Sequence, residues 1–134
     1  MKVINTIFLI IVTLVLLSFK AYANNVTFEA GDDSTATKLC IAAGSNNLHA
    51  TQKYIKSLSW QQTGMYQKTN SVLAEVSCNK SNLMEFTAQY NADKTYNFLN
   101  DKAKNKYKLT TEEIKIIDIA KVKDAPQVIV VTSR

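Results

Sequence analysis

Two cysteines, Cys40 and Cys78, enclose the stretch IAAGSNNLHATQKYIKSLSWQQTGMYQKTNSVLAEVS, and the chain contains no third cysteine. The 37 residues between them show helical patterning on both sides of a break rich in Gln and Gly. Four residues at the start of this region share one face of a predicted helix: Ala36, Leu39, Cys40 and Ala43. This spacing places Cys40 on a buried stripe. We therefore expect a helical segment closed by the two cysteines, with the rest of the chain attached to it.

Five short helices are predicted from apolar periodicity and capping residues. The first is capped by Asp32, Asp33 or Ser34 and stops at Gly44. The second begins near Asn47, the third runs from about Met65 to Val76, the fourth is capped by Asn79, Ser81 or Asn82, and the fifth opens at Asn91 or Asp93. Glu85 follows Asn82 at capping-box spacing. The sequence therefore predicts a small bundle whose helices begin and end at Asn, Ser and Gly residues.

The beginning of the chain has the features of a secretory signal peptide. A positive start at Met1-Lys2 precedes an apolar run from Ile7 to Leu17, and Ala21-Tyr22-Ala23 offers a cleavage triplet. The apolar run is shorter than the ~20 residues of a membrane-spanning helix, which disfavours an uncleaved anchor. We predict a signal peptide over residues 1–23, cleaved after Ala23, and a periplasmic or secreted protein.

The mature part, residues 24–134, is predicted to be a single small domain. Loss of Lys2 and Lys20 with the signal peptide lowers its formal charge from +5 to +3. Nearly all of the basic residues are lysines, whereas planar recognition of phosphate favours arginine. We therefore expect no nucleic acid as a partner.

Export exposes the two cysteines to an oxidising compartment, where a disulfide between Cys40 and Cys78 is the simplest outcome. A redox-active site would need a second cysteine close to the first or a lowered thiol pKa, and the spacing offers no such neighbour. Closing a loop of this length stabilises a fold by about 4 kcal/mol in the chain-entropy account. The pair is therefore predicted to be structural.

Several short motifs of the chain are similar to those of a known family. They are Asp33-Ser34, Leu39-Cys40-Ile41-Ala42-Ala43, Cys78-Asn79 and Phe86-x-x-x-Tyr90. Their order resembles a family of small exported gammaproteobacterial proteins, Domain of Unknown Function 3718, over roughly residues 28–100. The resemblance implies a compartment and an architecture, and it transfers no catalytic residue.

The tail is predicted to add β-structure, so the expected fold class is α+β, with an all-α fold as the alternative. The predicted domain has a helical core over residues 24–100, a Lys-rich connection over 101–109 and a hairpin tail over 110–134. Residues 114–122 combine β-branched side chains with a capping box in front of them, so strand and helix both stay open there. Residues 128–132 read as a strand, and Val26–Glu29 could add a third strand.

The strand at 128–132 is apolar on both faces. Either helices cover the sheet on both sides, or one face or edge serves a partner.

Four lysines alternate with other residues in the connection: Lys102, Lys104, Lys106 and Lys108. They could form a cationic strip for an anionic surface, or they could be a solvated linker.

Catalytic chemistry has few candidates in this sequence, and we predict no catalytic, metal or cofactor residue. His49 is the only histidine, and the three glycines form no phosphate-binding loop. The leading expectation is a non-catalytic binding module whose partner is an envelope protein or an anionic surface. The alternatives are a carboxylate-based envelope hydrolase and a surface-associating protein that uses the four lysines.

Overall fold

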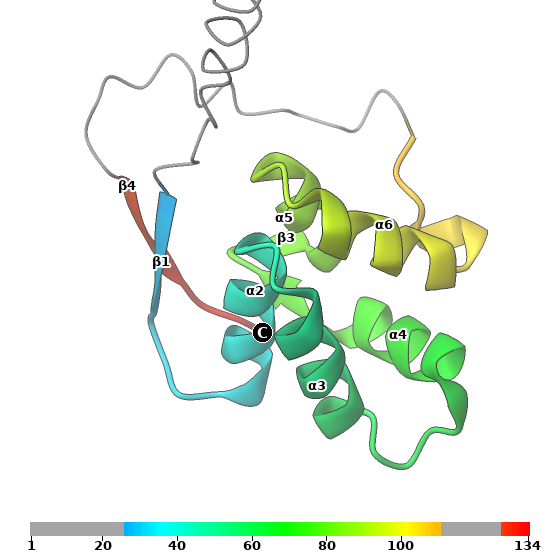
Figure 1. Cartoon of the computed structure of the whole chain (residues 1–134). Helices are drawn as coiled ribbons and strands as arrows, with labels where there is room; N and C mark the ends of the chain where they lie inside the picture. Colours follow the sequence, from blue (N-terminus) through cyan, green and yellow to red (C-terminus); the bar gives the residue numbers. More distant parts are fainter. Residues whose placement is uncertain (1–25, 111–126) are drawn as a thin grey trace, which may run out of the picture.

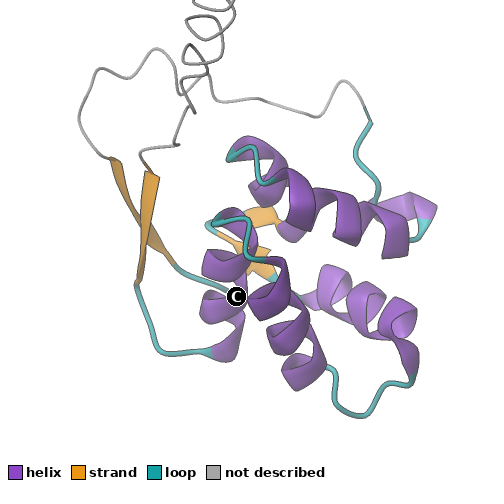
Figure 2. Cartoon of the chain, in the orientation of Figure 1, coloured by secondary structure: helices purple, strands orange, loops and turns teal. Residues whose placement is uncertain are grey.

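The structure is a computed structural model, and it describes residues 26–110 and 127–134. Its elements follow in the order β1 (Val26–Ala30), α2 (Thr35–Gly44), α3 (Leu48–Leu58), α4 (Gly64–Glu75), β2 (Ser77–Cys78), β3 (Ser81–Asn82), α5 (Leu83–Gln89), α6 (Asp93–Lys102), a short 3-10 helix (Asn105–Tyr107) and β4 (Gln127–Val131). The β1–β4 ribbon stands beside the helices, as Figures 1 and 2 show. The predicted signal peptide and the uncertain segment 114–122 lie outside the described residues.

The α+β class predicted from the sequence is confirmed, and the five predicted helices are found in order. Local capping explains where several of them begin. The Ser34 side chain accepts a hydrogen bond from the Thr37 N–H, and the Asn47 side chain accepts one from the Ala50 N–H. At α5 the predicted capping box is present, with Asn82 and Glu85 bonded in both directions.

The last strand, β4, has the strand near the start of the described residues as its neighbour. β4 pairs in parallel with β1, with Val26 opposite Gln127 and Ala30 opposite Val131. The third strand suggested at Val26–Glu29 is therefore confirmed, and among the described residues it is the neighbour of β4. The other half of the predicted hairpin falls within residues 111–126, outside the described part. A parallel neighbour so far away in sequence leaves no local turn signal, which is why the pattern did not reveal it.

A small antiparallel hairpin, β2–β3, was not predicted. Its two-residue turn consists of Asn79 and Lys80, whose φ values are 47° and 72°. Two successive left-handed residues form the turn type that suits tight hairpins. The sequence prediction placed Cys78 at a junction between helices. Cys78 lies between α4 and α5, inside β2.

The corner between α2 and α3 corrects the interpretation of Gly44. Gly44 is the last helical residue, as expected, but the left-handed residue is Asn46, with a φ of 57°. The N–H groups of Asn46 and Asn47 donate to the carbonyls of Ala43 and Ala42, at 3.1 and 2.9 Å. These two bonds form a Schellman closure, with Asn in the position that glycine usually takes.

Gly44 is required by packing instead. A Cβ atom at this position would lie 2.7 Å from Cε1 of Phe86 and 2.9 Å from Cζ of Phe28. The rings of Phe28, Phe86 and Tyr90 stack against one another with centroids 4.9 to 5.9 Å apart. The missing side chain therefore lets β1 and α5 close over the end of α2.

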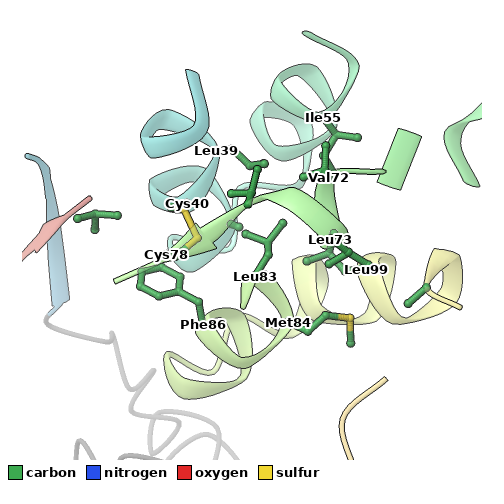
Figure 3. Packing of buried hydrophobic residues seen from close by; sticks show 14 residues of the cluster. Leu39, Cys40, Ile55, Val72, Leu73, Cys78, Leu83, Met84, Phe86 and Leu99 are labelled. Atoms are coloured by element: carbon green, nitrogen blue, oxygen red, sulfur yellow. A yellow bond between two sulfur atoms is a disulfide. The ribbon is translucent and has the colours of Figure 1, made fainter. Parts of the chain in front are cut away.

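The core gathers one or more apolar side chains from each of the five helices and from β2 and β4. Figure 3 shows Leu39, Leu83 and Phe86 beside the disulfide, with Ile55 and Val72 further along the cluster. The largest fully buried side chains include Phe86, Leu39, Ile55, Leu83, Met84 and Leu99. Burial of a Leu, Ile or Phe contributes about 1.5–3 kcal/mol each, so this cluster is the main source of stability.

Candidate functional site

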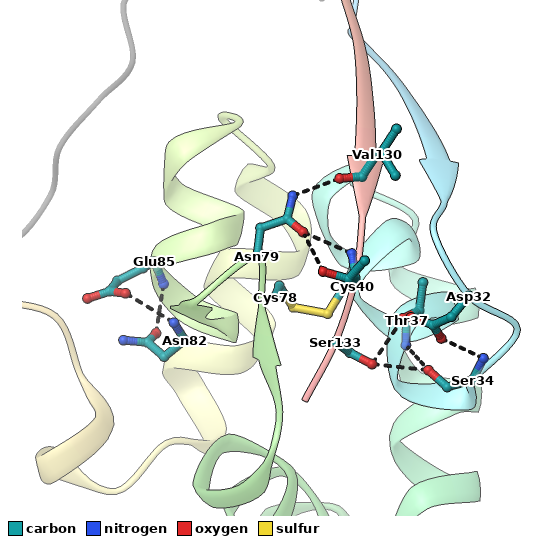
Figure 4. The surroundings of a disulfide bond; sticks show 11 residues. Asp32, Ser34, Thr37, Cys40, Cys78, Asn79, Asn82, Glu85, Val130 and Ser133 are labelled. Atoms are coloured by element: carbon teal, nitrogen blue, oxygen red, sulfur yellow. Dashed lines mark hydrogen bonds between the residues drawn. A yellow bond between two sulfur atoms is a disulfide. The ribbon is translucent and has the colours of Figure 1, made fainter.

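The two cysteines form a disulfide, as predicted, between α2 and β2. Both residues are fully buried, and their Cα atoms are 5.7 Å apart. Figure 4 shows the sulfur atoms between the helix and the strand, below the end of β4. Because neither sulfur is open to solvent, the bond staples the core and offers no surface for thiol exchange.

Hydroxyl groups and one carboxylate surround the N-terminal end of α2 (Figure 4). The Thr37 Oγ1 lies 2.8 Å from the Asp32 carboxylate and 3.0 Å from the Ser133 Oγ, and the Ser34 N–H donates to Asp32 at 2.8 Å. Hydrogen bonds from the Ser34 side chain and backbone, then from Thr37, hold the pKa of Asp32 below its ordinary value. The group ties the end of the chain to the start of α2, and the lowered pKa makes the Asp32 carboxylate a weak base toward the Thr37 hydroxyl.

Asn79 performs a similar task on the other side of β4. Its side chain donates to the Val130 carbonyl at 3.0 Å and accepts from the Thr132 N–H at 2.9 Å (Figure 4). Its backbone N–H donates to the Thr132 carbonyl at 3.0 Å. Asn79 therefore bonds to the backbone around the end of β4 as a neighbouring strand would. This covers the edge of β4 near its C-terminal end.

The predicted Lys strip lies within the described residues. Lys102 ends α6 and is paired with the Asp101 carboxylate, and the Lys104 N–H donates to the buried Asn70 at 2.8 Å. The Lys106 ammonium lies 4.6 Å from the centre of the Tyr107 ring. The hydrogen bond and charge of Lys102, with the more distant charge of Lys108, lower the pKa of Asp101. A carboxylate thus offsets part of the positive charge of the strip.

A small cleft of about 130 Å³ runs beside this strip. Its lining includes the Glu85 carboxylate and the side chains of Lys106, Tyr107 and Lys108. One oxygen of Glu85 is already bonded to the Asn82 N–H in the capping box. The cleft is too small for a drug-sized ligand, which typically needs about 300 Å³ or more.

The single histidine, for which the sequence predicted no catalytic role, lies on the surface. His49 is exposed as the second residue of α3. The described residues contain no group of three or more His, Cys, Asp or Glu side chains placed to share a metal ion. Within the same residues, no helix combines the length and apolar character needed to cross a bilayer.

The sequence did not reveal three Asn residues that hold loops in place, or the exposure of the one tryptophan. Asn46, Asn70 and Asn79 each bond to a segment distant in sequence. Trp60 lies in the connection between α3 and α4, and 75% of its surface is exposed. The apolar character of a Trp in a Gln-rich connection was the available signal.

Comparison with protein families adds one finding. The model of a family described as Protein of unknown function (DUF3718) matches residues 39–116, more than half of the chain. The chain belongs to this family. The resemblance drawn from the cysteine and aromatic motifs is therefore confirmed, and the match extends past residue 100 into the tail. No curated protein and no solved structure matches the chain.

Proposed function

We propose that this member of the family is an exported, non-catalytic binding module of the periplasm or the cell exterior. The observation that carries the proposal is the outer face of β4. Val128 and Val130 are 53% and 57% exposed, whereas Ile129 packs against the core and Val131 is fully buried. Of the two possibilities that the apolar strand left open, helices on both sides or an uncovered face, the second fits these residues.

Two residues of β1 lie next to the two valines. The parallel register places Thr27 opposite Val128 and Glu29 opposite Val130, and all four residues are exposed. Two β-branched apolar side chains, side by side on a strand, are ready to receive alternate side chains of an extended partner segment. A partner with apolar residues at every second position therefore suits this surface, which we call the β4 face (Thr27, Glu29, Val128 and Val130).

Export is supported by the disulfide. A buried disulfide between α2 and β2 persists in an oxidising compartment and is rare in a reducing one. The proposal therefore places the protein outside the cytoplasm, where its partner would be an envelope protein.

The test is crosslinking in intact cells. Wild type is compared with a Val128→Thr/Val130→Thr variant, because Thr keeps the β-branched shape while it removes the apolar surface. We expect discrete crosslinked species in the wild type and a loss of those species in the variant. A Lys104→Gln/Lys106→Gln variant serves as the matched control for two surface substitutions. Equal capture by all three proteins would count against the β4 face.

A second candidate is an anionic surface bound by Lys102–Lys108. It is favoured by the exposure of Lys104, Lys106 and Lys108 on one short segment. The pairing of Lys102 with Asp101 weakens it. The third alternative, a carboxylate hydrolase, requires an acid with a raised pKa. The pKa values of Asp32 and Asp101 move in the opposite direction, so neither residue fits that role.

A further inference from the structure

Acidic residues are missing from a long part of the chain, which folds into α2, α3 and most of α4. From Ser34 to Ala74 the chain has no Asp or Glu, and its charged residues there are Lys38, Lys53, Lys56 and Lys68. Lys38 lies 3.9 Å from Asp33, so it has a counter-charge. The other three lysines belong to α3 and α4, the helical hairpin that stands at one end of the molecule in Figure 1. The acid of this hairpin, Glu75, is the last residue of α4, so the charged residues of α3 and of α4 up to Ala74 are all lysines.

α3 presents its positive groups on one side. Thr51 and Ile55 face the core, whereas Lys53 and Lys56, one turn apart, are exposed. Together with His49 they border one shallow surface hollow, whose lining contains no acidic residue. Two ammonium groups, with no acidic residue among the described residues that line the hollow, give a local potential that attracts anions.

Two aromatic side chains of the same helical hairpin are also exposed. Trp60 follows the end of α3 by two residues and is 75% exposed, and Tyr66 in the first turn of α4 is 44% exposed. These two residues and the two valines of the β4 face are the exposed large hydrophobic side chains of the described residues. The connection between the two helices otherwise consists of Ser, Gln and Thr. The large indole of Trp60 is thus left mostly in water.

We infer that the end of the α3–α4 hairpin, Lys53, Lys56, Trp60 and Tyr66, docks on the surface of an anionic lipid bilayer. Trp and Tyr favour the headgroup region, where the apolar ring is buried and its polar edge stays wet. Lysine side chains of the same hairpin reach lipid phosphates through their flexible stems. The inference does not depend on the β4 face, which lies away from this hairpin in Figure 1 and would remain free for a partner.

A bilayer suits this surface better than a soluble polyanion does. The lysines alone would serve either ligand, but the exposed indole gains most from a phase that removes its apolar area from water. The surface also fits better than the Lys102–Lys108 strip, because Asp101 pairs with Lys102 there and Glu85 lines the adjoining cleft. Anionic lipid repels such carboxylates.

Trp60 makes the test direct, because it is the only tryptophan of the chain. The processed, oxidised protein is purified from cells that export the full chain and is mixed with vesicles of phosphatidylcholine, with or without phosphatidylglycerol. We expect a blue shift of the Trp60 emission and its quenching by brominated lipid only with the anionic vesicles. Both signals should fade as salt is raised, because the attraction is screened.

Variants then locate the surface. Lys53→Gln/Lys56→Gln should weaken vesicle binding by roughly thirtyfold at low salt, and the charge-matched Lys104→Gln/Lys106→Gln control should change it little. Trp60→Ser, followed by vesicle sedimentation, should also reduce binding. Circular dichroism checks that every variant is folded.

Three results would overturn the inference: no binding of the folded wild type to anionic vesicles, a greater loss in the Lys104/Lys106 variant, or a Trp60 shift with dextran sulfate but not with vesicles. Each of them leaves the crosslinking result for the β4 face untouched, so the two proposals fail separately.

Discussion

The side-chain oxygen of Asn46, in the turn after α2, accepts a 2.8 Å hydrogen bond from the backbone N–H of Lys94, 48 residues further along the chain. The same oxygen lies 3.2 Å from the Thr95 N–H. These donors belong to the first turn of α6, whose own capping position is Ala92 and makes no side-chain bond. Asn46 therefore ends one helix through its backbone and caps another through its side chain.

This double role predicts two separable losses. In Asn46→Gly the left-handed backbone is retained and the cap of α6 is lost, which should cost about 1 kcal/mol of unfolding free energy. In Asn46→Ala the strained φ adds about 1–2 kcal/mol more. Urea unfolding of the oxidised proteins measures both. Equal stability of the two variants would show that the left-handed position carries no strain.

The sign of the stability change in Gly44→Ala tests the packing at the end of α2. In an ordinary helix interior, Gly→Ala stabilises by about 1 kcal/mol. Here the new Cβ would meet the rings of Phe86 and Phe28, so Gly44→Ala should destabilise by about 1–3 kcal/mol. Thermal unfolding gives the sign. Phe28→Leu in the same chain should recover part of the loss, and a gain in stability for the single Gly44→Ala variant would contradict the packing.

The disulfide should matter mainly to stability. It closes a sequence separation of 38 residues, and its removal in Cys40→Ala/Cys78→Ala should lower the unfolding free energy by about 4 kcal/mol. Reduction of the wild type under urea should give a loss of similar size. If the double variant unfolds at the same urea concentration as the oxidised wild type, the staple does not support the fold.

Acid should weaken the end of the chain through Asp32. Because hydrogen bonds from Ser34 and Thr37 lower its pKa in the folded protein, the ionised carboxylate stabilises the fold above its unfolded pKa. That contribution disappears as the pH falls through the lower, folded value. In Asp32→Asn this part of the acid dependence should be absent. NMR titration of the Asp32 carboxyl checks the direction, and a pKa above that of a free Asp would refute it.

Much of the helical frame could be predicted because its signals are local. Ser34, Asn47 and the Asn82–Glu85 pair cap helices within their own first turns, and the stripe through Leu39 and Cys40 is repeated every helical turn. The disulfide followed from the presence of two cysteines in a chain with export features. These inferences needed no knowledge of distant neighbours.

What escaped prediction depends on residues far apart in sequence. No local turn connects Phe28 with Ile129, so no short sequence signal predicts their parallel pairing. The buried amide of Asn70 donates to the Lys102 carbonyl, 32 residues away, at 2.7 Å. Such bonds depend on how the chain returns to itself, which no local pattern encodes. Whether a side chain is exposed also depends on segments far away in sequence. The exposure of Trp60 and Val130 could therefore be seen only in the structure.

The central claim is that the β4 face binds a partner in the envelope. The most direct measurement places a photo-crosslinking amino acid at position 130, on that face, and in a second protein at Gln67, which is also exposed but lies on α4. Irradiation of intact cells should give a discrete intermolecular adduct from position 130 and none of the same mass from position 67. Identical adducts from both positions, or none from position 130, would contradict the account.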